Sequence, residues 1–252
     1  MDSAPRLSLV LPTYNEAANL EHLVRALIEV LDGARVSFEI VIVDDNSPDG
    51  TGGIADQLAA GSGGRVRALH RKEERGLGTA VVAGWKAARG EILAVMDADG
   101  QHPPDLIPRL LAALDPGAEV AVASRYISGS DIPRWNLLRR LGSRLATAIT
   151  RLALPRAAAG VRDPLSGCFA LRRELIQGVE PKPLGFKILL EVLMRAPVTR
   201  VTEVEYVFAA REAGKSKLSA RVALLDAMQI LRSSWQVRGK AGGSRQEAGR
   251  RG

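Results

Sequence analysis

The residues best suited to chemistry in this sequence are two aspartates, Asp97 and Asp99, which directly follow the apolar run from Ile92 to Met96. Carboxylate oxygens are the ligands that Mg²⁺ and Mn²⁺ prefer, and such ions commonly share them with substrate phosphates. A bound ion of this kind can neutralise a departing nucleoside diphosphate. By itself an Asp-x-Asp motif is more often a solvated turn before a helix. Its place at a strand end and the neighbouring motifs favour the metal site.

A second acidic segment, residues 44–50 (DDNSPDG), follows the apolar run 38–43. One of its carboxylates can bind a base or a ribose hydroxyl, as acidic residues do at comparable positions of dinucleotide-binding folds. The same residue types are typical of a turn in which Ser47 or Asp49 caps the next helix, and one segment can do both. Residues 76–78 (GLG) open a helix whose N-terminus can face an anion, although a plain helix start is an equally good interpretation.

Basic side chains at the ends of predicted elements form a third set, which includes Arg211 and Lys215. Arginine forks match phosphate oxygens, so Arg125, within Ser124–Arg125–Tyr126, can help to clamp an acceptor phosphate. Ordinary surface charge is the alternative for most of these residues individually. The segment 135–154 places leucines at helical spacing among four arginines. That pattern is typical either of a packed helix or of a helix lying on anionic lipid.

The elements that must position these side chains alternate regularly over the first half of the chain. Short apolar runs predict strands, and segments with apolar residues at helical spacing separate them. Such alternation predicts an α/β fold with a mostly parallel sheet and helices on both faces, whose ligands bind beyond the carboxyl ends of the strands. The acidic segments lie at those ends. The predicted strands are 7–11, 38–43, 66–69, 92–96 and 120–123, and the predicted helices are 20–31, 51–60, 77–89 and 104–114.

The second half of the chain is less regular. We expect a single domain over residues 1–235, in which 1–125 binds the donor and 126–235 faces the acceptor and the membrane. Residues 236–252 are rich in Gly and Arg, with one Lys and one Ser, and predict a disordered basic tail. The elements predicted in this half are helices at 135–154, 187–195 and 218–235 and strands at 169–171 and 201–208.

The composition of the chain limits the classes of function. With 252 residues, 46% of them hydrophobic, the chain is long enough for one sizeable domain. The lone cysteine, Cys168, excludes an internal disulfide and fits a reducing compartment. The net charge of +7 favours an anionic partner, but only 4% of the residues are aromatic, which argues against a nucleic-acid-binding module. No apolar stretch is long enough to span a bilayer, so we expect peripheral contact with a membrane.

These segments together resemble the family-2 glycosyltransferases of the GT-A fold, and more narrowly the polyprenyl- or dolichyl-phosphate mannose synthases of the soluble catalytic type. The matching segments follow the order of that family and span about residues 7 to 235. Several segments in order are far more specific than any one motif. They are LPTYNEAANL (11–20), VDDNSPDGT (43–51), GLGTA (76–80), MDADGQHPPDLIP (96–108), SRY (124–126), RDPLSGCFALRR (162–173), GFKILLEVL (185–193) and EVEYVFAAREAGKSKL (203–218).

The resemblance implies roles for individual residues and makes Asp97, Asp99 and Arg125 the catalytic residues. The metal and the diphosphate would be surrounded by Asp97, Asp99 and Gln101. The acceptor phosphate would be received by Arg125, Arg139 and Ser143. The donor would contact Pro12, Tyr14, Glu16, Asp44, Asp45, Gly76, Gly78, Asp97 and Ala98, with Arg211 and Lys215 in a loop that closes over it.

The implied reaction is an inverting transfer of mannose from GDP-mannose to a polyprenyl phosphate, with Mg²⁺ or Mn²⁺ as cofactor. A phosphate monoester is largely dianionic at neutral pH, so it needs a general base less than a hydroxyl acceptor does. The expected location is peripheral, at the cytoplasmic face of the cell membrane, with an integral-membrane protein as a partner. Many relatives carry C-terminal transmembrane helices that this sequence lacks.

Three points stay open at the level of sequence. Glucosyl transfer from UDP-glucose to undecaprenyl phosphate is separated poorly from mannosyl transfer. A nucleotidyltransferase, the alternative from another enzyme class, would carry a glycine-rich loop with a basic residue where Pro12 to Glu16 stands. Leu165 departs from the resemblance, because the family usually has a hydroxyl residue at this position, and this puts the role of its turn in doubt.

Overall fold

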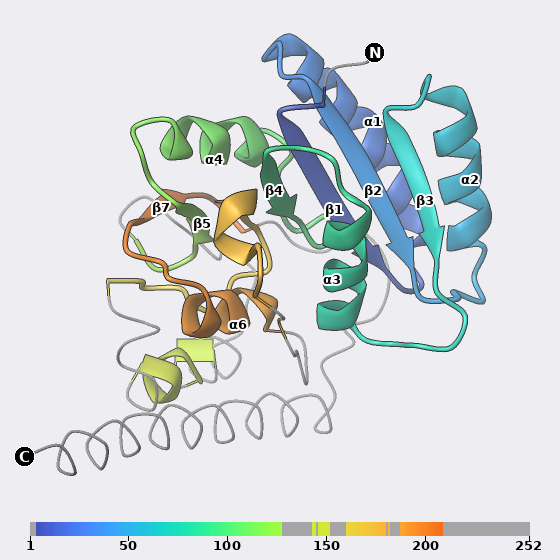
Figure 1. The fold of residues 1–252 in the computed structure, drawn as a ribbon. Helices are drawn as coiled ribbons and strands as arrows, with labels where there is room; N and C mark the ends of the chain where they lie inside the picture. The colour runs from blue at the N-terminus through green and yellow to red at the C-terminus, as the bar shows by residue number, and fades with distance from the viewer. Residues whose placement is uncertain are drawn as a thin grey trace, which may run out of the picture.

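The computed structural model describes residues 4–127, 143–144, 146–151, 160–179, 181 and 187–208. In this part of the chain a seven-stranded sheet has the order β3-β2-β1-β4-β6-β5-β7 (Figure 1). The strands are β1 (Leu7–Thr13), β2 (Phe38–Asp44), β3 (Val66–His70), β4 (Ile92–Val95), β5 (Val120–Ser124), β6 (Phe169–Arg172) and β7 (Val201–Glu205).

The first four strands form the parallel sheet that the alternation predicts. β1 pairs in parallel with both β2 and β4, and β2 pairs in parallel with β3. β1, β2 and β4 are buried along their whole length, which explains why they read as continuous apolar runs. Their carboxyl ends lie at one edge of the sheet, where Thr13 is opposite Asp44 and Asp44 is opposite His70.

Strand order beyond β4 differs from a simple continuation of the alternating pattern. β6 lies between β4 and β5 and is antiparallel to both, while β7 pairs in parallel with β5. The run of apolar residues that predicts a strand carries no information about its direction, so this insertion was not predicted. Because β6 runs against its neighbours, its beginning lies at the carboxyl ends of β4 and β5. The turn before Phe169 therefore reaches the edge of the sheet where Asp97 follows β4.

Helices cover both faces of the sheet, as predicted (Figure 1). One hydrophobic cluster joins the sheet to the first, second and fourth helices, and a second cluster joins its other face to the remaining two. The short 3₁₀ helix Arg173–Ile176 follows β6. The α-helices are α1 (Ala17–Gly33), α2 (Thr51–Gly61), α3 (Leu77–Ala87), α4 (Leu106–Leu114) and α6 (Ile188–Arg195).

Several predicted elements fall outside the described residues. Of the predicted helix 135–154, only residues 143–144 and 146–151 are described, and these are helical. The predicted helix 218–235 and the predicted basic tail 236–252 lie wholly outside. Among the residues that the structure describes, no helix is long and apolar enough to cross a bilayer.

Candidate functional site

The Asp-x-Asp motif lies where β4 ends at the ligand-binding edge of the sheet. Asp99 and Gln101 are nearly buried, at 8% and 7% exposure, and the backbone N–H of Gln101 donates to Asp99 Oδ1 at 3.1 Å. The Asp97 side chain keeps 31% of its surface exposed. Its Oδ1 atom is nevertheless buried and has no hydrogen-bond partner among the described residues. Buried carboxylate oxygens are rarely left unpaired, so this atom marks a position where a further ligand belongs.

The surroundings of Asp97 disfavour its negative charge. Desolvation by the surrounding protein, followed by repulsion from Asp99, raises the pKa of Asp97 to about 7. The cations of Lys187 and Arg125 act in the opposite direction and lower this pKa. Their influence shows that both basic side chains lie within electrostatic reach of the Asp-x-Asp motif. A carboxylate that is poorly compensated in this way favours the binding of an additional cation.

The side chain of His102 is buried beside the Asp-x-Asp motif. Its ring is 3% exposed, stacks on Tyr206 with 5.3 Å between centroids, and meets the edge of Phe208 at 5.4 Å. Burial is the main reason that the pKa of His102 is lowered to about 4, so the imidazole is uncharged at neutral pH. Its Nε2 atom is 4.0 Å from Asp97 Oδ2. His102 thus packs the motif against the segment that follows β7.

The described residues fit a divalent ion that the substrate helps to hold. No group of three or more His, Cys, Asp or Glu side chains in the described part of the chain is arranged to hold a metal by itself. Mg²⁺ and similar ions are commonly bound by one or two carboxylates, with substrate phosphates and waters completing the shell. Asp97 and Asp99, with an unpaired buried oxygen on Asp97, supply the protein's share of such a site.

Arg125, at the end of β5, is held by a buried aspartate. Its Nε and Nη2 atoms donate to the two carboxylate oxygens of Asp163 at 2.7 and 2.8 Å, and its backbone N–H donates to Asp163 Oδ2 at 3.1 Å. Burial opposes the charge of the guanidinium, but Asp163 outweighs it, and the pKa of Arg125 is raised above its ordinary value. The guanidinium also lies over the rings of Tyr126 and Phe208, at 5.4 and 5.9 Å. Arg125 therefore keeps its charge in a fixed orientation.

Ser143 contacts Tyr126, the residue that follows Arg125 in the chain. The hydroxyl groups of Ser143 and Tyr126 are 2.6 Å apart. The joint action of Ser143 and Arg125 on an acceptor stays a prediction. Arg139, the third predicted acceptor residue, and Arg211 and Lys215 of the predicted closing loop lie outside the described residues.

The predicted donor residues Asp44 and Asp45 are both buried and both engaged within the protein. Asp44 accepts hydrogen bonds from the hydroxyl and backbone N–H of Ser47 at 2.5 and 3.0 Å. Asp45 accepts from Arg71 Nε at 2.7 Å and from the backbone N–H of Gly76 at 2.8 Å. These bonds hold together the loops that follow β2 and β3 at the carboxyl ends of those strands. Their contact with a nucleoside stays a prediction.

Pro12 lies within β1, which continues to Thr13 beyond the predicted end at Leu11, and Tyr14 and Glu16 lie in the turn after it. Pro12 is buried in the strand, and the ring of Tyr14 lies under the guanidinium of Arg75 at 5.3 Å. The backbone N–H of Glu16 donates to Thr51 Oγ1 at 2.9 Å. The turn that follows β1 is thereby tied to the start of α2. The predicted cap is wrong in its position, because the N-cap of α2 is Gly50, which makes no side-chain capping bond, and Asp49 lies one residue earlier and accepts the backbone N–H of Thr51 at 3.1 Å.

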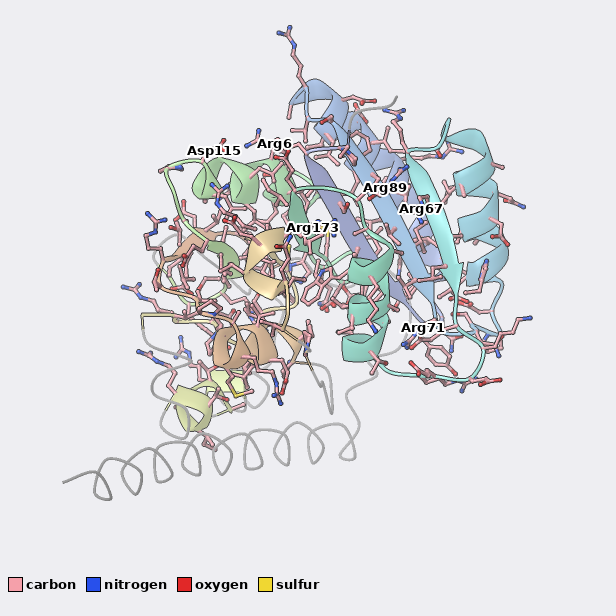
Figure 2. All side chains as sticks on the ribbon, in the orientation of Figure 1. Arg6, Arg67, Arg71, Arg89, Asp115 and Arg173 are labelled. Atoms are coloured by element: carbon pink, nitrogen blue, oxygen red, sulfur yellow. The ribbon has the colours of Figure 1, made fainter. Side chains whose placement is uncertain are left out.

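Gly76 and Gly78 lie at the start of α3, and Ala98 lies between the two aspartates. Gly76 has a φ of +140°, which a residue with a side chain rarely adopts, and its carbonyl accepts from Arg71 Nη2 at 3.2 Å. Figure 2 shows Arg71 at the end of the sheet opposite to Arg67 and Arg89. Arg71 thus belongs to the edge that carries the site.

Sequence reasoning missed three residues of this region: Arg71, Asp163 and Gly167. Arg71 is 8% exposed although arginine is seldom buried, and Asp163 is fully buried. Gly167 lies so close to Asp97 that a Cβ atom on it would be 2.1 Å from Asp97 Oδ2. Asp163 and Gly167 both lie in the segment RDPLSGCFALRR, so the family resemblance did point to this stretch without giving a role to either residue.

Comparison with known proteins agrees with this geometry. The family model described as glycosyl transferase family 2 matches residues 8–179, which is more than half of the chain. A dolichol-phosphate mannosyltransferase of Pyrococcus furiosus is 43% identical over 216 residues, covering 86% of this chain and 60% of that protein. The chain therefore spans less than two thirds of the length of this relative. A polyprenol monophosphomannose synthase of Mycolicibacterium smegmatis is 36% identical, covering 93% of this chain and 88% of that protein.

The fold also matches solved structures. The glucosyl-3-phosphoglycerate synthase of Mycobacterium tuberculosis, in complex with Mn²⁺, UDP-glucose and phosphoglyceric acid, superposes with a TM-score of 0.69. The match covers 92% of this chain and 79% of that chain at 20% sequence identity. At this level of identity the likeness concerns the fold, which agrees with the predicted α/β architecture with a mostly parallel sheet.

Proposed function

The chain belongs to glycosyl transferase family 2, and from this premise we propose that it transfers mannose, with inversion, from GDP-mannose to a polyprenyl phosphate. The observation that carries the proposal is the pairing of two sites of opposite charge at one edge of the sheet. Asp97 and Asp99 follow β4, and Arg125, held by Asp163, follows β5. The first site suits a metal and a diphosphate, and the second suits a phosphate acceptor.

Asp97, Asp99 and Gln101 would hold the divalent ion. When bound, the ion would neutralise the charge that develops on the departing GDP. The carboxylate oxygens of the two aspartates supply ligands of the kind that Mg²⁺ and Mn²⁺ prefer. The unpaired Oδ1 atom of Asp97 supports this role, since it lacks a partner among the described residues.

Arg125 and Ser143 would receive the phosphate of the acceptor. The phosphate monoester has its second pKa near 6 and is largely dianionic at neutral pH, so it can attack the anomeric carbon without a general base. The protein then has to orient it, and correct orientation alone can supply several kcal/mol of the barrier reduction. Asp163 fixes the guanidinium of Arg125, and the 2.6 Å contact with the hydroxyl of Tyr126 holds the hydroxyl of Ser143.

The names of the relatives support mannose as the sugar and a polyprenyl phosphate as the acceptor. Both are named for transfer of mannose to a dolichol or polyprenol phosphate, and the mycobacterial relative is matched over most of its length. Glucosyl transfer from UDP-glucose remains the second candidate within the same fold. Family membership decides against the nucleotidyltransferase and nucleic-acid alternatives.

A polyprenyl acceptor would place the reaction at a membrane surface. The acceptor's hydrocarbon chain stays in the bilayer, so the crevice would have to face the lipid headgroups. The net charge of +7 favours approach to an anionic surface. Peripheral binding at the cytoplasmic face, with recruitment by an integral-membrane protein, is the arrangement that we propose.

Transfer of radiolabel to lipid tests the proposed function. The purified chain is incubated with a short polyprenyl phosphate and either GDP-mannose or UDP-glucose, with Mg²⁺, Mn²⁺ or EDTA. We expect metal-dependent label in the lipid from GDP-mannose only. Label from UDP-glucose alone would refute the choice of mannose. Absence of label from both donors, also with anionic vesicles present, would refute the polyprenyl phosphate acceptor.

The role of Arg125 is tested with Arg125→Lys, which keeps the charge and removes the fork. We expect the KM for the acceptor to rise about tenfold or more while the KM for GDP-mannose changes little, because lysine keeps the charge but loses the bidentate contact with Asp163 that orients the side chain toward the acceptor. An equal increase of both KM values would contradict the assignment.

A further inference from the structure

The turn formed by residues 163–167 (DPLSG) touches both halves of the site. It follows the described residues Gly160 to Arg162 and leads into β6, whose beginning lies between the carboxyl ends of β4 and β5. We propose that this turn is a positioning element that sets the acceptor-binding Arg125 and the metal-binding Asp97 relative to each other. The roles of those two residues are those of the proposed function, and the inference rests on it.

The acceptor end of the turn is Asp163. Its side chain is fully buried, and it receives three hydrogen bonds from Arg125, two from the guanidinium and one from the backbone. The backbone N–H of Asp163 in turn donates to Glu203 Oε1 of β7 at 2.9 Å. A bidentate contact between guanidinium and carboxylate fixes the plane of the fork as well as its position. Asp163 thus sets the direction from which Arg125 can meet a phosphate.

The metal end of the turn is Gly167. A Cβ atom placed on this residue would be 2.1 Å from Asp97 Oδ2 and 2.8 Å from its Cγ. No such contact is possible, so any side chain here would push the carboxylate of Asp97 aside. The bare backbone of Gly167 is therefore the surface against which Asp97 rests, and it limits the orientations that the carboxylate can take.

The middle of the turn is anchored to the core, which fixes the positions of its two ends while each end acts on its own partner. Ser166 Oγ donates to the carbonyl oxygen of Ala123 in β5 at 2.7 Å and accepts the backbone N–H of Cys168 at 3.2 Å. Leu165 is 7% exposed and packs in the hydrophobic cluster that contains α3 and α6. The structure thus accounts for the departure at this position, because the Leu165 side chain serves the core and the site is served by its neighbours.

Substitutions would have different effects in a turn that only supports the fold and in a turn that positions the two sites. Damage to a structural turn lowers the melting temperature and weakens donor and acceptor functions together. A positioning turn separates them, because Asp163 acts through Arg125 and Gly167 acts through Asp97. Residues that orient metal ligands commonly change affinity roughly 10- to 100-fold when substituted.

The experiment compares Asp163→Asn and Gly167→Ala, with Leu165→Ala as a matched control in the same turn. Binding of Mn²⁺ in the presence of GDP is measured by calorimetry, KM for a short polyprenyl phosphate by transfer, and stability by thermal melting. We expect Asp163→Asn to raise the acceptor KM about tenfold and leave Mn²⁺ binding within about twofold. We expect Gly167→Ala to weaken Mn²⁺ binding about tenfold. Leu165→Ala should lower the melting temperature and leave both constants within about twofold of wild type.

The proposal is overturned if each site variant changes both constants equally, or if Leu165→Ala reproduces either pattern. If Asp163→Asn does not fold, Asp163→Glu is used instead, because it keeps the charge but shifts the guanidinium of Arg125. Asp163→Glu must then raise the acceptor KM while Mn²⁺ binding stays unchanged. The calorimetric arm does not depend on transfer. If wild-type protein binds Mn²⁺ with GDP but transfers no mannose, the proposed function fails, while an unchanged affinity in Gly167→Ala would separately refute the role of the turn.

Discussion

Glu39 offers the most direct test of what stabilises the sheet, because it is a buried charged residue near the start of the otherwise apolar strand β2. Its side chain is 1% exposed, within β2. Oε1 accepts from Ser8 Oγ at 2.6 Å and from the backbone N–H of Arg89 at 2.5 Å. Oε2 accepts from Arg89 Nε at 2.9 Å and from Arg67 Nη1 at 3.2 Å. Figure 2 shows Arg67 and Arg89 together at the end of the sheet away from Arg71.

Glu39→Gln keeps the shape and removes half of this network. The amide oxygen can retain Ser8 and the backbone of Arg89, but the NH₂ group then faces two guanidinium groups that can only donate. Hydrogen bonds to charged groups contribute about 1.5–3 kcal/mol each. The side chains of Arg67 and Arg89 are 40% and 56% exposed and can turn to water, which reduces the loss. We expect a loss of roughly 2–4 kcal/mol in the free energy of unfolding, or a decrease in Tm of roughly 5–15 °C.

The direction of the pKa shift of Glu39 determines how its contribution to stability changes with pH. Burial alone would raise the pKa of Glu39, but hydrogen bonds from Ser8, Arg89 and Arg67 outweigh it and lower the pKa below 4.5. A lowered pKa means that the carboxylate stabilises the fold fully above the ordinary value. This contribution is lost as the pH falls through the lowered pKa. The difference between wild type and Glu39→Gln should therefore be constant near pH 7 and shrink below about pH 4.5.

Urea denaturation at several pH values measures this difference, with Glu21→Gln as the matched control. Glu21 makes an equally short contact with Arg25, at 2.8 Å, but both side chains are more than half exposed. Exposed pairs of this kind contribute about 0.3–0.5 kcal/mol. Equal effects of the two substitutions at pH 7, or a Glu39 effect that stays undiminished as the pH falls below about 4.5, would refute the reasoning. Kinetic constants of Glu39→Gln should match wild type, because the network lies at the other end of the sheet.

Three further predictions concern the site and the core. Asp99→Ala should lower kcat roughly 100-fold or more, because metal ions commonly supply several kcal/mol of stabilisation; retained metal-dependent turnover would contradict the metal assignment. Asp97→Asn should melt in EDTA at a temperature no lower than wild type, since it removes a charge that burial and then repulsion from Asp99 disfavour, and Mn²⁺ with GDP should raise the Tm of wild type only. Cys168 is fully buried, and burial raises its pKa well above the ordinary value. Its thiol should react with a chromogenic disulfide only after unfolding, and rapid reaction of native protein would show that the core opens there.

The alternating half of the fold was predictable because β1, β2 and β4 are mostly apolar and buried along their length, and β3 is a short, partly buried run. Such runs arise where both faces of a parallel strand are buried, and the predicted starts at Leu7, Phe38, Val66 and Ile92 are all confirmed. The order of the strands in the sheet had no comparable signal in the sequence. β6 pairs with β4 and β5 through backbone hydrogen bonds, and its four residues carry no signal of direction.

The position of the site was predictable, while the partners within it were not. Polar residues directly after β1, β2 and β4 lie at one edge because parallel strands share their carboxyl ends. The partner of Arg125 comes instead from Asp163, 38 residues further along the chain. Such a contact depends on the antiparallel return of β6, so it could not be predicted before the strand order was known. The roles of Arg139, Arg211 and Lys215 stay predictions, since they lie outside the described residues.

Glu39 and Asp97 lie at opposite ends of the sheet, and their surroundings shift their pKa values in opposite directions. The contrast distinguishes a carboxylate that stabilises the fold from one suited to binding. Glu39 has hydrogen bonds on both oxygens, and its pKa is lowered, so its charge supports the fold. Asp97 keeps one buried oxygen without a partner among the described residues, and its pKa is raised, so its charge costs stability. Elsewhere in the sheet a buried carboxylate is paired with arginines, since Arg67 and Arg89 both bind Glu39. A carboxylate left short of partners beside Asp99 is therefore best explained by a cation that arrives with the substrate, because only binding recovers the stability that the folded chain gives up there.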